Sequence, residues 1–336
     1  VTMQAEWFAL APRFLYMTAG GGALVWAAAL DRWITQESPG LWPRFLTWKR
    51  AGRRIAVRAV LIALLVPAAL YVRSGIRLYA MAGQAIWDAV EAATEAQVDR
   101  RHPLLLVNLP LRLTPGSRIY PLGFEGVTPL PARVPAEGIL QVHAGLPGAA
   151  EAVSFGAVAS QPPSAYTYQL YGQAVDWGDL IDAARRARVV YLTHYSPCHI
   201  GLVEAGSVGE SAPSAPPIAT FGEGVTLLAA KTSCPDGQVR LTTHWQAQSP
   251  IDRDVTAFVH LLSEQNALVA QADGYPLLGL MPFWAWTPGD VVRDVRHLAP
   301  VQAGTYTIRL GLWEPAPRER WLAGGSAAGA ILLPVR

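Results

Sequence analysis

The chain is poor in cysteine and in charged residues. Of its 336 residues two are cysteines, and 15% are Asp, Glu, Lys or Arg, whereas about 25% is usual for a soluble domain. Two cysteines allow one intrachain bridge, so a disulfide-rich scaffold is excluded. The formal net charge of +2 predicts no nucleic-acid partner, because such proteins cluster Lys and Arg on a folded face.

Sequence signatures of common enzymes are also missing. No G-x-G-x-x-G, G-x-x-x-x-G-K-[ST] or G-x-S-x-G occurs, so the sequence offers no phosphate cradle or nucleophile elbow. His194, Cys198 and His199 are close in sequence, but a zinc site needs four ligands, or three and a water. An ordinary turn after a strand explains them better. We therefore predict no metal, no cofactor and no catalytic residue in this chain, which leaves open whether it belongs to an enzyme.

What is present first is a strongly apolar N-terminal region, residues 1–77. Residues 14–30 and 59–72 carry no charge and are flanked by charged residues. We expect transmembrane helices at about 8–31 and 55–73, with a buried helix of a soluble domain as the alternative for the second. The basic loop between them predicts a cytoplasmic loop in a multi-pass cell-membrane protein with its large C-terminal part extracytoplasmic. The lipid bilayer is then a partner.

Residues 78–210 predict a small extracytoplasmic α/β unit. Residues 78–101 lack proline and show helical apolar spacing. Residues 176–188 begin with Asp and end in basic residues, as a helix should. Three apolar runs bounded by turn residues predict buried strands, namely 104–110, 189–195 and 200–206. Alternation of helix and strand implies a short sheet.

The pattern of apolar and polar residues changes after residues 211–217. These residues form a Ser-, Ala- and Pro-rich stretch that predicts a linker. From 218 to 336, short alternating apolar runs are separated by turns rich in Pro, Gly, Asp and Asn. This pattern predicts an antiparallel β-sandwich. The expected fold class is thus membrane-anchored α+β, with two transmembrane helices, a small α/β unit and a C-terminal sandwich.

One stretch resembles polytopic glycosyltransferases of the GT-C type. Residues 12–21, PRFLYMTAGG, are similar to the R-[YF]-L-Y-x-P-S-x-G segment of protein-mannosyltransferase-like membrane proteins, with Thr18 and Ala19 in place of Pro and Ser. The resemblance implies a lipid-phosphate sugar donor and an acidic residue in the first external loop. That loop would precede Val1, so no catalytic residue is carried over, and we expect the chain to be a fragment or processed product.

A second resemblance covers residues 224–313. These are similar to a β-sandwich module that follows the last membrane helix of some bacterial GT-C-like proteins, through WQA at 245–247, DRDVTAFVHLL at 252–262 and WTPGDVVRD at 286–294. The resemblance implies an Ig-like or carbohydrate-binding-like sandwich.

Together the two resemblances imply an extracytoplasmic accessory region of a lipid-linked-sugar glycosyltransferase-like membrane protein, related to cell-envelope glycans. Glycan or lipid-linked sugar would then be a partner. The alternative is a non-enzymatic, membrane-anchored interaction subunit that binds other membrane subunits. An independent enzyme in the α/β unit is the third hypothesis.

Aromatic residues supply the candidate ligand contacts. Phe283, Trp284 and Trp286 lie in MPFWAWTPGD, and Trp313 lies in a later strand. Aromatic faces stack on sugar rings; the alternative is that these side chains pack inward, or against a neighbouring domain or a membrane surface. Glu125 in YPLGFEG is a further candidate contact, with a solvated loop residue as its alternative.

The cysteines complete the sequence-based predictions. Cys198 and Cys234 could form one disulfide in an extracytoplasmic location, closing a loop of about 35 residues. Two unpaired thiols are the alternative.

Overall fold

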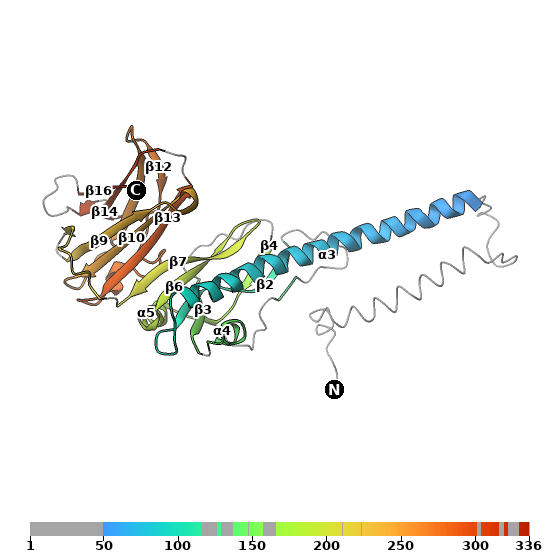
Figure 1. The fold of residues 1–336 in the computed structure, drawn as a ribbon, viewed down its shortest axis with the longest axis horizontal. Coiled ribbons are helices and arrows are strands. Elements are labelled where there is room, and N and C mark those ends of the chain that lie inside the picture. Colours follow the sequence, from blue (N-terminus) through green and yellow to red (C-terminus); the bar gives the residue numbers. More distant parts are fainter. Residues whose placement is uncertain are drawn as a thin grey trace.

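The computed structural model describes residues 50–115, 126–128, 137–146, 148–156, 166–209, 211–222, 224–300, 304–315, 319–321 and 329–335. These residues form a mostly β structure from which one long helix projects (Figure 1).

The described helices are α3 (Arg50–Glu95), α4 (Glu137–Ala144) and α5 (Trp177–Arg186). The strands of the first part are β1 (Leu104–Val107), β2 (Pro110–Pro115), β3 (Ala150–Ser154), β4 (Tyr166–Leu170), β5 (Gln173–Ala174), β6 (Val189–Tyr195) and β7 (Ile200–Val208). The later strands are β8 (Ala219–Phe221), β9 (Val225–Ser233), β10 (Gln238–Ala247), β11 (Thr256–Ser263), β12 (Leu268–Gln271), β13 (Val291–Pro300), β14 (Tyr306–Glu314), β15 (Glu319–Trp321) and β16 (Ile331–Pro334).

Helix α3 corrects the membrane part of the expected fold. The predicted span at 55–73 is only a section of this 46-residue helix, and across the described residues no helix combines the length and apolarity needed to cross a bilayer. The physical reason is that the uncharged stretch 59–72 covers about 21 Å of helix, short of a bilayer core of about 30 Å. The membrane-anchored fold class and the multi-pass location are therefore wrong. The other predicted span, 8–31, lies outside the described residues.

The C-terminal half of α3 packs on the sheet through a stripe of small and apolar side chains. Leu78, Met81, Ala82, Ala85 and Ala89 are all buried and recur at the spacing of one helical face. The helix ends at Glu95 rather than at residue 101. It ends there because Gln97 adopts a left-handed φ of 51° and the side chain of Asp99 accepts hydrogen bonds from the N–H groups of Arg101 and His102.

The main sheet has nine strands in the order β5-β3-β1-β6-β7-β13-β10-β9-β8. Strands β5, β3, β1 and β6 are parallel to one another, as an α/β unit predicts. From β6 onward each neighbouring pair is antiparallel, through β7, β13, β10, β9 and β8. The predicted α/β unit and sandwich thus share one sheet, joined by the pairing of β7 with β13. The boundaries 78–210, 211–217 and 218–336 remain predictions.

Gly206 makes this junction sterically feasible. It pairs with Val190 on one side and with Asp294 on the other, and its φ is 132°. A Cβ atom here would lie 1.8 Å from the carbonyl oxygen of Arg293, so any side chain would force the two strands apart. Glycine therefore lets one strand serve both halves of the sheet.

A second sheet completes the predicted sandwich, with β12, β11, β14 and β15 in order and β16 also paired to β14. All of these pairs are antiparallel. The predicted alternation on β10 is confirmed, since Val239, Leu241, Thr243 and Trp245 are all buried. The apolar core between the two sheets continues to α5, while α3 and α4 cover the opposite face of the nine-stranded sheet.

Candidate functional site

The connection from β12 to β13, residues 272–290, crosses from one sheet to the other and carries three of the four aromatic candidates. Two consecutive residues in it, Leu277 and Leu278, have φ angles of 55° and 56°. Left-handed backbone costs a branched residue about 1–3 kcal/mol and persists only where its surroundings over-determine it. Contacts from the surrounding strands must therefore hold this connection in place.

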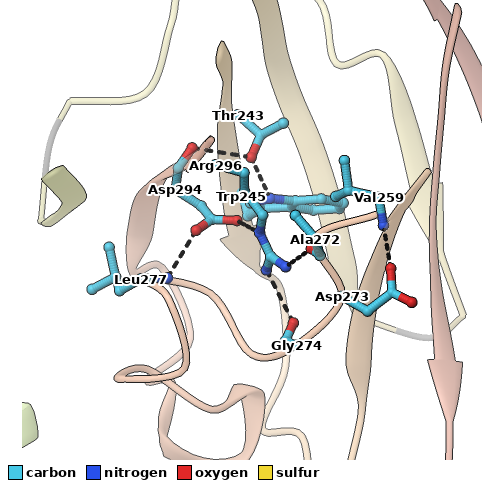
Figure 2. Close-up of polar contacts among 9 residues, drawn as sticks. All are labelled: Thr243, Trp245, Val259, Ala272, Asp273, Gly274, Leu277, Asp294 and Arg296. Carbon is cyan, nitrogen blue, oxygen red and sulfur yellow. Dashed lines mark hydrogen bonds and ion pairs between the residues drawn. The ribbon is translucent and has the colours of Figure 1, made fainter. Parts of the chain in front are cut away.

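A buried ion pair on β13 holds it. Asp294 and Arg296 are 2% and 3% exposed, and Arg296 Nε lies 2.8 Å from Asp294 Oδ2. The other carboxylate oxygen of Asp294 accepts a hydrogen bond of 2.8 Å from the N–H of Leu277. Arg296 donates to the carbonyl oxygens of Ala272 and Gly274 (Figure 2). Each charge is paired and hydrogen-bonded, which is what burial requires, and the strained backbone is held as a result.

The start of the connection is also tied to β11. Asp273 Oδ1 accepts a hydrogen bond of 2.9 Å from Val259 N (Figure 2), and Oδ2 lies 3.3 Å from His260 Nε2. Tyr275 donates to Asp254; burial and then this hydrogen bond raise the pKa of Tyr275 to about 12. Tyr275 therefore stays protonated and keeps donating at neutral pH.

Two of the aromatic candidates are core residues. Phe283 and Trp286 are buried, with ring centroids 4.7 Å apart, and Trp286 Nε1 donates to Met281 O at 3.1 Å. Phe283 also meets Trp245 edge to face. The structure thus places these two where the inward-packing alternative put them, as anchors of the connection.

Trp284 points the other way. The 3-10 turn Phe283–Ala285 breaks strand-like alternation, and Trp284 is left 44% exposed. Its ring lies edge to face against Trp177, with centroids 5.7 Å apart, and Trp177 in turn meets Phe155 at 4.6 Å. We call Trp284, Trp177 and Phe155 the aromatic row.

The aromatic row lies where α/β sheets commonly bind ligands. Phe155 directly follows β3, and Trp177 is the first residue of α5. Ligands of open α/β sheets bind outside the carboxyl ends of the parallel strands. Sequence reasoning missed Phe155 and Trp177 because each reads as an ordinary apolar residue at the end of an element. The signal that was available is Asp176, the predicted and observed N-cap, whose side chain accepts from Asp179 N at 3.0 Å.

Arg185 fixes the aromatic row to the sandwich. Its Nη2 donates to the carbonyl oxygen of Ala285 at 3.0 Å, to Thr287 Oγ1 at 2.8 Å and to Asp290 Oδ2 at 3.0 Å. Asp290 Oδ2 also accepts from Thr287 N at 2.9 Å. Residues on both sides of Trp286 are therefore bound to α5, which holds Trp284 and Trp177 together.

The remaining candidates are not brought to this place. Trp313 lies on β14 with its side chain on the face opposite Leu310 and Leu312, which are core residues. Glu125 lies outside the described residues. Cys198 and Cys234 are both free and exposed, so the predicted disulfide is not formed.

His194, Cys198 and His199 form no metal centre. Within the part of the chain that the structure describes, no three His, Cys, Asp or Glu side chains are placed to hold an ion. Arg77 Nη2 instead donates to Cys198 Sγ at 3.1 Å.

Comparison with known proteins assigns no family to this chain. No protein-family model matches the chain, and no curated protein matches it. A search of solved structures finds the crystal structure of the C-terminal domain of wzt, 12% identical, with 38% of this chain and 82% of that chain covered and a TM-score of 0.25. With a TM-score this low, the similarity does not bear on function.

Proposed function

We propose that this chain is a carbohydrate-binding accessory module, related to cell-envelope glycans, that acts on a glycan chain by holding it rather than by cleaving it. The observation that supports this is the exposed face of Trp284, held against Trp177 beside the carboxyl ends of the parallel strands. The C–H faces of a sugar ring pack on aromatic rings, whose faces carry partial negative charge.

The rigidity of the aromatic row supports the same proposal. The ion pair Asp294–Arg296 and the three hydrogen bonds of Arg185 hold the connection 272–290 before any ligand arrives. Pre-ordering of a binding surface raises affinity because less conformational entropy is lost on binding.

The finer proposal is that the module serves a lipid-linked-sugar glycosyltransferase-like protein. The resemblance of residues 224–313 to the sandwich modules of GT-C-like proteins supports it. An upstream catalytic part would then build or transfer the glycan that the aromatic row holds.

A second candidate function is that of a non-enzymatic interaction subunit. The observation that favours it is the exposure of large apolar side chains on the part of α3 that precedes Leu78, where Ile55, Leu65 and Ile76 are the most open. Such an apolar patch marks an interaction site in a folded protein. Crosslinking through single cysteines at these positions tests it, and crosslinks to no other protein would rule it out.

The glycan proposal is tested by affinity electrophoresis of the full chain in gels that contain cell-envelope polysaccharide. Trp284→Ala should weaken retention about tenfold, because a favourable ring contact contributes up to about 1.5 kcal/mol. The matched control is Trp87→Ala, an exposed tryptophan on α3, which should bind like the native chain. Equal retention of the Trp284 and Trp87 variants would end the proposal. Trp286→Ala would not test glycan binding, because it removes a core side chain and so disturbs the fold.

A further inference from the structure

Two arginine-rich segments meet at the amino-terminal edge of the parallel strands. One follows α3 at residues 100–102, and the other closes α5 at 185–188. Strands β1 and β6 begin directly after these segments and are parallel neighbours, with Leu104 paired to Val189. This register brings the two segments together, and Arg188 N donates to Pro103 O at 2.8 Å.

We call the basic side chains gathered there the basic edge. Its members are Arg100, Arg101, His102, Arg185, Arg186 and Arg188. Only Arg185 is partly covered, and the other five are exposed.

The fold pairs some of the basic side chains of this edge with carboxylates, but not all of them. Arg185 is paired with Asp290 at 3.0 Å and Arg186 with Glu151 at 3.2 Å, and both also suit the C-terminus of α5, where cations are favourable. Neither Arg101 nor Arg188 takes part in an ion pair within the described residues. Neither lies in the last turn of a helix, so the helix dipole does not account for them.

Two crevices flank the turn that carries the basic edge. One, of about 600 Å³, is lined by Arg100, Arg101 and Arg186 together with Glu151. The other, of about 810 Å³, is lined by His102, Arg185 and Arg188 together with Glu95, Glu204 and Arg293. In the first crevice Gly148 lies against Arg100, and a Cβ there would lie 2.9 Å from the Arg100 Cγ atom. Glycine at 148 therefore leaves room for Arg100 to lie along the crevice wall.

We propose that the basic edge binds a phosphate-bearing ligand. Guanidinium groups present a planar fork of donors that matches phosphate oxygens, and several of them together are typical of phosphate recognition. Arg101 and Arg188 supply guanidinium groups that form no ion pair within the described residues, and Arg100 and Arg186 extend the donor surface along the first crevice. The formal net charge of the whole chain, +2, hides this site because the charge is local.

The inference goes beyond the proposed glycan binding and does not rest on it. The aromatic row lies at the carboxyl ends of the parallel strands and the basic edge at their amino ends, so each can be removed alone. Trp284→Ala should leave phosphate binding unchanged, and Arg101→Gln with Arg188→Gln, which leaves Arg185 in place, should leave retention by a neutral polysaccharide unchanged.

The test is isothermal titration of the full chain with inorganic pyrophosphate at low ionic strength. Arg101→Gln with Arg188→Gln should weaken binding at least tenfold, because a charge-assisted hydrogen bond contributes enough for about that factor. The matched control is Arg73→Gln with Lys231→Gln, two exposed cations far from the edge in sequence, which changes the net charge equally. Near-ultraviolet circular dichroism verifies that each variant is folded.

Three results would overturn the proposal. Absence of binding by the native chain at millimolar pyrophosphate is the first. An equal loss in the control pair would show that net charge alone was measured. Equal affinity for a tricarboxylate such as citrate would show that the edge does not select phosphate.

Discussion

Asp294 and Arg296 form an ion pair inside the core of the sandwich, two positions apart on one strand, with Nε and Oδ2 2.8 Å apart. Removal of one partner leaves an uncompensated buried charge. We expect Arg296→Met to lower the free energy of unfolding by about 3–5 kcal/mol, measured by urea denaturation. The exposed arginine Arg253, which pairs with Glu314, is the control: Arg253→Gln should cost about 1 kcal/mol or less. Similar losses in the two variants would contradict this role of the buried pair.

Trp284 and Trp286 should differ sharply in their effect on stability. Trp286→Ala empties a buried site and should cost about 3–5 kcal/mol. Trp284→Ala should cost about 1 kcal/mol or less, because the residue is 44% exposed and its ring packs edge to face on Trp177. Thermal and urea unfolding of both variants provide the measurement. A large loss for Trp284→Ala would mean that it is an anchor of the fold rather than a ligand surface.

Asn108 combines a strained backbone with a structural amide. Its φ is 63°, and its side chain exchanges two hydrogen bonds with the backbone of Phe155, at 3.0 and 2.7 Å. Asn108→Ala loses both bonds and should cost about 2–3 kcal/mol. Asn108→Gly loses the same bonds but tolerates the left-handed conformation. We therefore expect the glycine variant to be the more stable of the two in urea unfolding; the reverse order would show that backbone strain is unimportant here.

His297 should make the fold sensitive to mild acid. Burial, followed by the neighbouring positive charge of Arg240, holds the pKa of His297 below its ordinary value of 6.5, and Nε2 is buried with no hydrogen-bond partner among the described residues. The unfolded chain therefore takes up a proton near pH 6.5 that the folded chain binds only at lower pH. Stability should fall as the pH drops below about 7, until the folded pKa is passed.

The measurement for His297 is the difference in melting temperature between pH 7.5 and pH 5.5. His297→Gln should show a smaller difference than the native chain, whatever its absolute stability. His102→Gln is the control, because His102 is exposed. Equal pH dependence in all three proteins would remove His297 as the cause.

The two cysteines should both react in the folded chain. Cys198 and Cys234 are free and exposed, so a thiol reagent such as dithionitrobenzoate should titrate two groups without denaturant. If fewer than two thiols react in freshly purified, unreduced protein and a reductant restores the number to two, the cysteines form the disulfide that the sequence allowed.

Local structure was largely determined by the sequence itself. The apolar run at 189–195 and the capped helix at 176–188 were found in place as β6 and α5, because burial periodicity and end capping depend on neighbouring residues. Alternation on β10 likewise indicated the buried face of the sandwich. The membrane prediction failed in the described part because the uncharged stretch 59–72 is too short an apolar segment to cross a bilayer core.

What only the tertiary structure decided concerns partners that are distant in sequence. The pairing of β7 with β13 makes one sheet of two predicted units, and strand edges carry no local mark of the strand they will bind. Trp284 and Trp286 are both tryptophans and lie two positions apart. The 3-10 turn and the contacts with α5 nevertheless leave Trp284 exposed and Trp286 buried. The aromatic row and the basic edge arise in the same way, since each joins segments whose closeness is set by sheet order and register rather than by their own composition.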